Sequence, residues 1–188
     1  MLVKRIFDLV LSVFALLLFA IPMLLVALIV CFTSPGPILY WSDRVGKDNK
    51  IFKMPKFRSM SVDAPVQATH LILNPKVYLT PIGSFLRKSS LDELPQLWSI
   101  LIGYMSFVGP RPALYNQYDL ISLREEFGVH KLTPGLTGWA QVNGRDELHI
   151  LEKAKLDAVY LQQQSLLFDI QILWLSVEKV LLRDGVLH

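Results

Sequence analysis

Residues 9–32 read LVLSVFALLLFAIPMLLVALIVCF, and this apolar run decides the architecture of the chain. Only Ser12 and Pro22 interrupt it, and its 24 residues exceed the ~20 that a helix needs to cross the hydrocarbon core of a bilayer. A secretory signal peptide is disfavoured, because the run is too long and no small-x-small cleavage site follows it. The run therefore predicts a membrane helix.

Two features argue against a simple membrane span. Pro22 lacks an amide hydrogen and its ring clashes with the preceding turn, so a bend is expected near the middle of the run. Lys4 and Arg5 precede the run and further basic residues follow it, so the positive-inside tendency places both ends in the cytoplasm. A re-entrant helix that enters, bends at Pro22 and returns to the same face satisfies both features. A kinked span is the alternative.

The composition of the chain excludes several classes of protein. With 188 residues, 52% of them apolar and 19% charged, the chain has room for one modest domain and lacks the signature of intrinsic disorder. A single cysteine, Cys31, excludes a disulfide scaffold and zinc clusters of the Cys-x-x-Cys kind. The net charge of +3 is too small to indicate a nucleic-acid partner.

Basic residues gather in one segment, residues 43–58. It holds two acidic and six basic residues, the latter being Arg44, Lys47, Lys50, Lys53, Lys56 and Arg58. Such a segment is typical of a solvated basic hairpin, of a surface that meets anionic lipid, or of a site for a phosphate-bearing ligand. The sequence leaves these three interpretations open.

The remainder of the chain is predicted to be mainly α with one short β-hairpin. Two short strands, Ile38–Trp41 and Lys50–Met54, flank a turn at Gly46–Asn49. The expected organisation is a re-entrant membrane helix over residues 1–33, followed by a cytoplasmic, membrane-associated catalytic domain over residues 34–188.

Apolar residues at helical spacing predict three amphipathic helices, Leu91–Ile102, Glu147–Gln162 and Ser165–Arg183. The last of them carries Trp174 on a wide apolar stripe, which suits a helix at the membrane interface and a packed core equally well. Three further segments are predicted as loops, namely residues 61–81, 109–112 and 133–144.

Two adjacent carboxylates, Asp92 and Glu93, open the first of these helices. A local explanation exists, because Ser90-x-x-Glu93 is a capping box and acidic residues in a first turn complement the helix dipole. Consecutive helix positions diverge by ~100°, so the pair cannot flank a sugar as the two carboxylates of a glycosidase do. It can instead hold a divalent cation, or divide the roles of nucleophile and base.

Arginines near this pair have the geometry that phosphate recognition requires. Arg87 precedes the pair, Arg111 lies between two prolines that hold its backbone extended, and Arg145 ends a glycine-rich segment. Guanidinium forks match phosphate oxygens bidentately. Taken one at a time, each of these residues is better explained as a surface arginine.

Four motifs occur in order, namely Lys56-Phe-Arg-Ser-Met60, Leu91-Asp-Glu-Leu-Pro-Gln-Leu97, Met105-Ser-Phe-Val-Gly-Pro-Arg-Pro112 and Pro134-Gly-Leu-Thr-Gly-Trp-Ala-Gln-Val-Asn-Gly-Arg145. Together they resemble the bacterial sugar transferase family, in the minimal form of its monotopic phosphoglycosyl transferases. The resemblance runs from Lys4-Arg-Ile-Phe-Asp8 to the last predicted helix. One departure is Ile21 ahead of Pro22, where family members often carry a serine whose hydroxyl helps to bend the helix.

The resemblance implies a reaction in which a sugar-1-phosphate passes from a UDP-sugar to polyprenol (undecaprenyl) phosphate and UMP leaves. Asp92 matches the nucleophile that forms an aspartyl-phosphosugar intermediate in the family, and Glu93 matches the second member of the dyad. The family requires Mg2+, which the resemblance places beside Asp92 and Glu93. Family residues that bind phosphates or the nucleotide are matched here by Lys56, Arg87, Arg111 and Arg145.

The resemblance also implies a location and a set of partners. Family members carry a re-entrant N-terminal helix and lie in the bacterial inner (cytoplasmic) membrane with the catalytic domain facing the cytoplasm. An N-acetylated or bacillosamine-like amino sugar is the expected substrate, and UDP-galactose or UDP-glucose is the alternative. A competing class is a catalytically idle, membrane-anchored binding protein, but the dyad and the arginines favour an enzyme.

Overall fold

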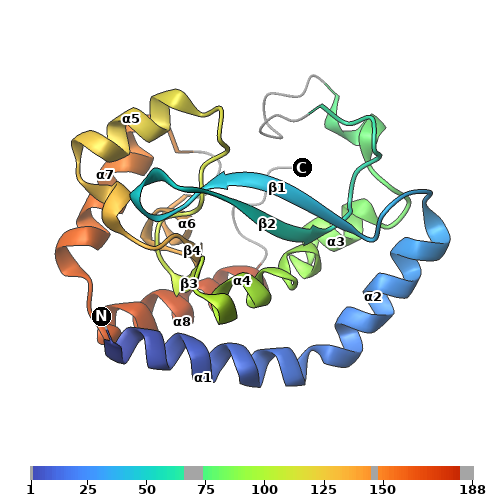
Figure 1. The fold of residues 1–188 in the computed structure, drawn as a ribbon, viewed down its shortest axis with the longest axis horizontal. Coiled ribbons are helices and arrows are strands. Elements are labelled where there is room, and N and C mark those ends of the chain that lie inside the picture. The colour runs from blue at the N-terminus through green and yellow to red at the C-terminus, as the bar shows by residue number, and fades with distance from the viewer. Residues whose placement is uncertain (1, 66–73, 145–147, 183–188) are drawn as a thin grey trace.

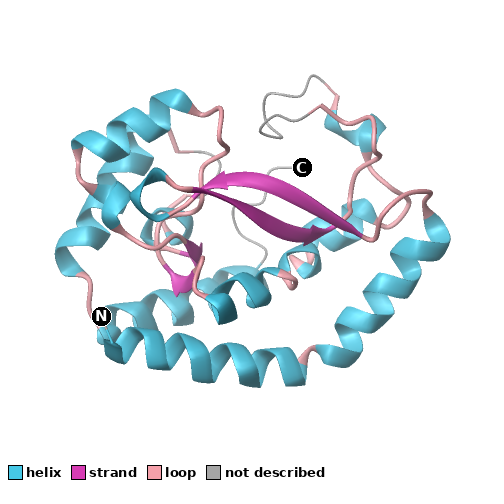
Figure 2. Ribbon diagram, viewed as in Figure 1, coloured by secondary structure: helices cyan, strands magenta, loops and turns pink. Residues whose placement is uncertain are grey.

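The computed structural model describes residues 2–65, 74–144 and 148–182, without the side chains of residues 180–182. It is mostly helical, with two small two-stranded sheets (Figure 2). The helices are α1 (Leu2–Leu18), α2 (Ala20–Thr33), α3 (Gly83–Lys88), α4 (Gln96–Ile102), α5 (Tyr118–Glu126), α6 (Trp139–Val142), α7 (Ile150–Gln163) and α8 (Leu166–Leu182). The strands are β1 (Leu39–Val45), β2 (Ile51–Phe57), β3 (Ser106–Val108) and β4 (Gly135–Thr137). Short 3₁₀ turns lie at Lys47–Asn49, Pro75–Tyr78, Leu91–Glu93 (η4) and Val129–Lys131.

The apolar run forms two helices, α1 and α2, that meet at an angle of 59° and curve around one side of the molecule (Figure 1). The break lies at Phe19 and not at Pro22 as predicted, because Pro22 has no N–H for the carbonyl of Leu18 and its ring crowds that carbonyl one turn earlier. Within the described residues, no single helix has the length and apolarity to cross a bilayer, whereas this bent pair meets both criteria when taken together.

The basic residues at the start of α1 are bound within the protein. Lys4 forms an ion pair with the buried Asp169 of α8, with 2.5 Å between Nζ and Oδ2. Arg5 donates hydrogen bonds of 2.7 Å to each of two carbonyls in the last turn of α4, those of Ile100 and Leu101. Both carbonyls lie in the last turn of α4, where the helix offers no further N–H, and the Ile100 carbonyl also accepts from the Gly103 N–H. Arg5 therefore adds to the C-terminal cap of α4. The first turn of α1 is therefore an integral part of the domain.

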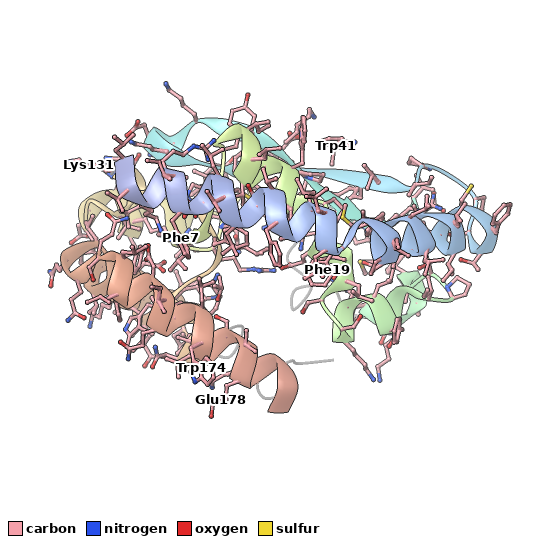
Figure 3. The ribbon with its side chains drawn as sticks, turned by 90° about the horizontal axis from the view of Figure 1, so that it is seen from below. Phe7, Phe19, Trp41, Lys131, Trp174 and Glu178 are labelled. Atoms are coloured by element: carbon pink, nitrogen blue, oxygen red, sulfur yellow. The ribbon has the colours of Figure 1, made fainter. Side chains whose placement is uncertain are left out.

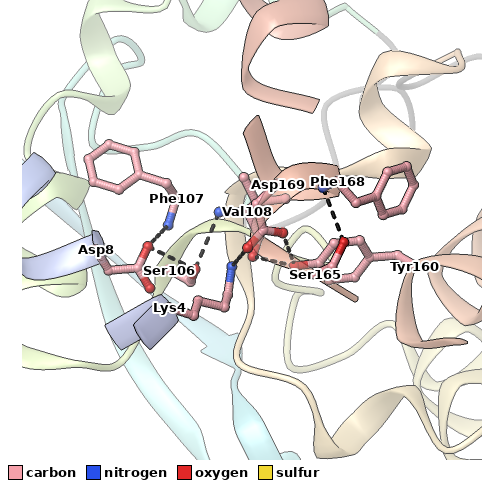
Figure 4. A network of polar contacts seen from close by, with 9 residues as sticks. All are labelled: Lys4, Asp8, Ser106, Phe107, Val108, Tyr160, Ser165, Phe168 and Asp169. Carbon is pink, nitrogen blue, oxygen red and sulfur yellow. Dashed lines mark hydrogen bonds and ion pairs between the residues drawn. The ribbon is translucent and has the colours of Figure 1, made fainter. Parts of the chain in front are cut away.

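A second set of polar contacts fixes α1 to β3 (Figure 4). The buried carboxylate of Asp8 accepts hydrogen bonds of 3.1 Å from Ser106 Oγ and from the backbone N–H that follows it. The Tyr160 hydroxyl of α7 lies 2.6 Å from Asp169 Oδ1 and 3.2 Å from the carbonyl that ends β3. Helix α8 begins beside the first turn of α1 and diverges from it (Figure 3). β3 is thus held by side chains from two helices.

Several elements confirm the sequence predictions. The hairpin β1–β2 is antiparallel, with register from Leu39↔Phe57 to Val45↔Ile51, so its strands extend further than expected. Helices α7 and α8 match the last two predicted helices within the described residues. The segment 133–144 was predicted as a loop, but it contains β4, which pairs in parallel with β3, and the short helix α6.

The predicted helix Leu91–Ile102 is wrong in its first half. The chain forms the 3₁₀ turn η4 at Leu91–Glu93, and α4 begins only at Gln96. Pro95 has no N–H to continue a helical ladder from η4, so the two elements remain separate. Leu97 and Ile100 of α4 point inward as expected, whereas Trp98 and Ile102 are exposed. The domain core includes Phe52, Met54, Leu97, Ile100, Met105, Phe107, Val108, Tyr160 and Ile172.

Glycines allow the ends of β3 and β4 to approach closely. A Cβ on Gly138 would lie 2.1 Å from the carbonyl oxygen of Gly109, and a Cβ on Gly135 would lie 2.1 Å from the Gly109 nitrogen. Because these contacts are with backbone atoms, no side chain fits at either position without displacing the main chain. The close contact fixes the starting point of the loop that carries Arg111.

Candidate active site

The turn η4 presents both dyad carboxylates at the centre of the domain. Ser90 has a left-handed backbone conformation (φ 56°) and its side chain makes no capping hydrogen bond, so the predicted capping box is absent. At the backbone, the Glu93 N–H donates a hydrogen bond of 3.1 Å to the Ser90 carbonyl. The Glu93 carboxylate is consequently available to groups from other elements.

Glu93 is bound by two cations from distant parts of the chain. Lys56 of β2 places Nζ 2.6 Å from Glu93 Oε1. Arg111 places Nη2 2.7 Å from Oε1 and Nη1 3.5 Å from Oε2, in the fork geometry that suits a carboxylate. Burial opposes ionisation of Glu93, but the charges of Arg111 and Lys56 and their hydrogen bonds outweigh it and hold the pKa of Glu93 well below its usual range.

Asp92 lies in a different environment from its neighbour. It is only 6% exposed, and within the described residues no hydrogen bond or ion pair to its side chain is present. Burial raises the pKa of Asp92 to about 6, with Lys56 opposing the shift and Glu93 reinforcing it. A carboxylate that is ionised at neutral pH but poorly solvated is a competent nucleophile. The opposite pKa shifts of the two carboxylates indicate different roles.

The loop that carries Arg111 is held by a buried ion pair from α5 and α7. Arg124 donates to the Arg111 carbonyl at 2.9 Å and pairs with Asp157, at 2.6 Å between Nη2 and Oδ2. Arg124 and Asp157 are both buried. Burial raises the pKa of Asp157, and Arg124 opposes that shift. The pair therefore fixes the backbone from which Arg111 reaches Glu93.

The structure brings most of the predicted site residues together. Lys56 and Arg111 contact Glu93, and Arg87 of α3 is near enough to Asp92 for its charge to lower the pKa of that carboxyl. Arg87 also places Nη1 3.7 Å from the sulfur of Met60. Arg145 lies outside the described residues.

Sequence reasoning missed Arg44, Arg124 and Asp157. Arg124 and Asp157 are 33 positions apart and belong to no motif, so only their contact reveals them. Arg44 was grouped with the basic hairpin. Strand alternation from the buried Ser42 places Arg44 on the inner face of β1, but the predicted strand ended at Trp41, so only the structure reveals this placement.

A magnesium site would have to be built around the dyad. Among the described residues no group of three or more His, Cys, Asp or Glu side chains is arranged to hold a metal. Magnesium typically takes only one or two protein carboxylates and completes its shell with water and substrate phosphates. The carboxylate of Asp92, which no described side chain binds, lies beside Glu93 and fits that requirement.

Nearly the whole chain is similar to a known protein family. The sequence profile described as "Bacterial sugar transferase" matches residues 1–183. The chain belongs to the bacterial sugar transferase family. A relative from Bacillus subtilis (strain 168), an uncharacterized sugar transferase named EpsL, is 37% identical over 186 residues, which cover 99% of this chain and 91% of the relative.

Other relatives of this bacterial sugar transferase carry more specific names. The UDP-glucose:undecaprenyl-phosphate glucose-1-phosphate transferase of Escherichia coli (strain K12) is 43% identical over 189 residues, covering 95% of this chain. The UDP-galactose-lipid carrier transferase of Erwinia amylovora is 36% identical over 199 residues, covering 97% of this chain. The chain spans only 40% of the length of the first protein and 41% of the second.

Proposed function

We propose that this sugar transferase moves a sugar-1-phosphate from a UDP-sugar to undecaprenyl phosphate, with release of UMP. The observation that carries the proposal is the dyad. A buried Asp92 with a raised pKa, to which no described side chain is hydrogen-bonded, lies next to a Glu93 that Lys56 and Arg111 hold ionised. The names of the relatives in Escherichia coli and Erwinia amylovora support the same chemistry. The complete dyad opposes a catalytically idle binding protein.

The chain's own residues supply a two-step route. An Asp92 oxygen attacks the sugar-bearing phosphorus of the UDP-sugar, the bond from that phosphorus to the bridging oxygen breaks, and UMP leaves with the electron pair. A phosphate oxygen of the lipid then attacks the same phosphorus and displaces the Asp92 carboxylate. Arg111 and Lys56, already fixed by Glu93, place positive charge where the phosphoryl oxygens gain charge in both steps.

Magnesium fits the same arrangement. Asp92 and Glu93 would hold it together with oxygens of the diphosphate. When bound, it would neutralise charge on the diphosphate and on the departing UMP. Lys56 and Arg111 already bind the oxygens of Glu93. The carboxylate of Asp92, which no described side chain binds, therefore has more oxygen lone pairs available for a metal ion.

The sugar is proposed to be glucose or galactose. The sequence analysis favoured an N-acetylated amino sugar, but the names of the relatives point to the alternative of UDP-glucose or UDP-galactose. We therefore correct the substrate expectation to a neutral hexose.

We further propose that the protein is monotopic in the bacterial cytoplasmic membrane, with α1 and α2 as a re-entrant pair and the dyad on the cytoplasmic side. The 59° bend and the apolar outer faces of both helices support this topology (Figure 3). The large apolar residues that α1 and α2 expose include Val10, Val13, Phe14, Leu17, Ile21, Leu24, Leu25, Leu28 and Phe32. On α8, Trp174 is 74% exposed, which suits a helix at the interface.

The test is a transfer assay with the full chain in detergent or nanodiscs, undecaprenyl phosphate, magnesium and radiolabelled UDP-glucose, UDP-galactose or UDP-N-acetylglucosamine. We expect lipid-linked product and UMP from one of the two hexose donors, and neither from Asp92→Asn. Without lipid acceptor, mass spectrometry should find a hexose-phosphate adduct on the peptide that contains Asp92. Wild-type protein that transfers no sugar from any donor, or an active Asp92→Asn variant, would refute the proposal.

A further inference from the structure

Arg44 is a half-buried arginine of β1 whose role neither the motifs nor the dyad explains. The structure gives other basic residues of the segment 43–58 separate roles. Lys56 binds the dyad, and Arg58 donates to carbonyls at the end of α2. Lys53 is exposed and pairs with Asp43 on the surface of the hairpin. Arg44 is half-buried, and among the described residues no acidic side chain binds it.

The β1–β2 hairpin places Arg44 on the same face as Lys56, which binds the dyad. Arg44 lies two positions after the buried Ser42, so both are on the inner face of β1. Lys56 is directly opposite Tyr40 in the register and projects from the same face of the hairpin. The Arg44 guanidinium donates from Nε to Ser42 Oγ at 3.0 Å and from Nη1 to the carbonyl of Pro112 at 3.1 Å.

The charge of Arg44 has no counterion of its own in the described part of the chain. Both acceptors of its hydrogen bonds are neutral, and the nearby carboxylate of Glu93 is already bound by Lys56 and Arg111. Burial, together with the positive charge of Arg111, lowers the pKa of Arg44 to about 10, so it stays protonated at neutral pH. A half-buried guanidinium without an anion is unfavourable, which makes this corner of the site an anion-binding position.

We propose that Arg44 binds a phosphoryl group of the substrate beside Arg111. This inference rests on the proposed function, which supplies a diphosphate on the nucleotide sugar and a phosphate on the lipid. Arg44 Nη2 makes no hydrogen bond to the described residues. Nη1 and Nη2 lie in one plane and can donate to two oxygens of a phosphate. The group that Arg44 binds is a phosphoryl oxygen. The KM values for the nucleotide sugar and for undecaprenyl phosphate distinguish which substrate supplies it.

Two substitutions separate phosphate binding from simple support of the loop. In R44Q the amide nitrogen occupies the position of Arg44 Nε, so it can still donate to Ser42 Oγ but carries no charge and does not reach the Pro112 carbonyl. In R44K the charge remains but the fork is lost. The matched control is K53Q, which removes a charge from the exposed side of the same hairpin. Thermal unfolding of all three proteins in detergent checks that they are folded.

Binding of UDP and of inorganic pyrophosphate is measured by calorimetry on the full chain, which needs no turnover. We expect R44Q to weaken one or both ligands by about 10- to 100-fold, as the loss of charge-assisted hydrogen bonds implies. R44K should weaken them by roughly 3- to 10-fold, since a point charge replaces a fork. K53Q should stay within about twofold of wild type, because exposed ion pairs contribute little.

Steady-state kinetics then identify the source of the phosphoryl group. A raised KM for UDP-glucose or UDP-galactose assigns Arg44 to the nucleotide sugar, and a raised KM for undecaprenyl phosphate alone assigns it to the lipid. If R44Q fails to fold, R44K decides. The proposal is overturned if the Arg44 variants fold and match K53Q in their affinities for UDP and pyrophosphate and in both KM values. Arg44 would then only support Pro112. If wild type transfers no sugar, the binding measurements still test Arg44, so the two failures are distinguishable.

Discussion

Asp92→Asn should inactivate the enzyme and yet stabilise the fold, because the wild-type carboxylate is ionised at neutral pH in a site that desolvates it. Burial raises the pKa of Asp92 from an ordinary 3.8 to about 6. At about 1.36 kcal/mol per pKa unit, this rise corresponds to about 3 kcal/mol of destabilisation once Asp92 is ionised. Asparagine has nearly the same shape and carries no charge to desolvate.

The sign of the pH dependence follows from proton binding. Between about pH 4 and pH 6 the folded protein holds a proton on Asp92 that the unfolded chain has released, so stability falls as the pH rises through this window. Below the window both states are protonated, and above it the full penalty is present. The variant lacks this titration, so its advantage should grow from near zero at pH 4 to about 3 kcal/mol at pH 8.

The measurement is thermal or denaturant unfolding of both proteins in detergent with EDTA, from pH 4 to pH 8. An advantage of about 3 kcal/mol corresponds to a rise in Tm of roughly 6 to 12 °C for a chain of this size. The control is Glu93→Gln, which should show the opposite sign at pH 8, because Arg111 and Lys56 lose their shared carboxylate. The reasoning is refuted if Asp92→Asn is no more stable than the wild type at pH 8. It is also refuted if the difference in unfolding free energy between the two proteins does not change with pH.

The remaining predictions concern activity, the Arg111 loop and the membrane helices. In the wild type, kcat/KM should fall below about pH 6 as Asp92 becomes protonated, which a pH–rate profile with magnesium and lipid acceptor will show. Arg124→Met should lower the unfolding free energy by about 3–5 kcal/mol, because it leaves the carboxylate of Asp157 buried without its partner. Adding Asp157→Leu should restore stability but not kcat, since the Arg111 carbonyl still lacks its donor. Pro22→Ala restores an N–H in the first turn of α2, so α1 and α2 should straighten into one membrane span in part of the molecules and carry the N-terminus outside. A cysteine at position 2 in a cysteine-free background should then change from protected to partly labelled by an impermeant maleimide in spheroplasts. Full labelling in the protein that retains Pro22 would contradict the re-entrant topology.

The sequence by itself determined the elements that depend on local pattern. The apolar run, with its proline, predicted a helix broken by a bend, although the bend lies at Phe19 and not at Pro22. Two short strands around a Gly46–Asn49 turn predicted the hairpin. Helical spacing located α7 and α8, because one face of each must be apolar whatever it packs against. The motifs identified the family and named Asp92, Glu93, Lys56 and Arg111 before any contact was known.

Only the tertiary structure decided how these residues divide their roles. Asp92 and Glu93 are adjacent and chemically alike, so nothing local distinguishes them. Their pKa values move in opposite directions because Lys56 and Arg111, which are 37 and 18 positions from Glu93, both reach that carboxylate. The capping box failed for the same reason: long-range ion pairs competed with a local hydrogen bond and prevailed. Electrostatic energy depends on distance in space and on burial, and neither is encoded in the spacing along the chain.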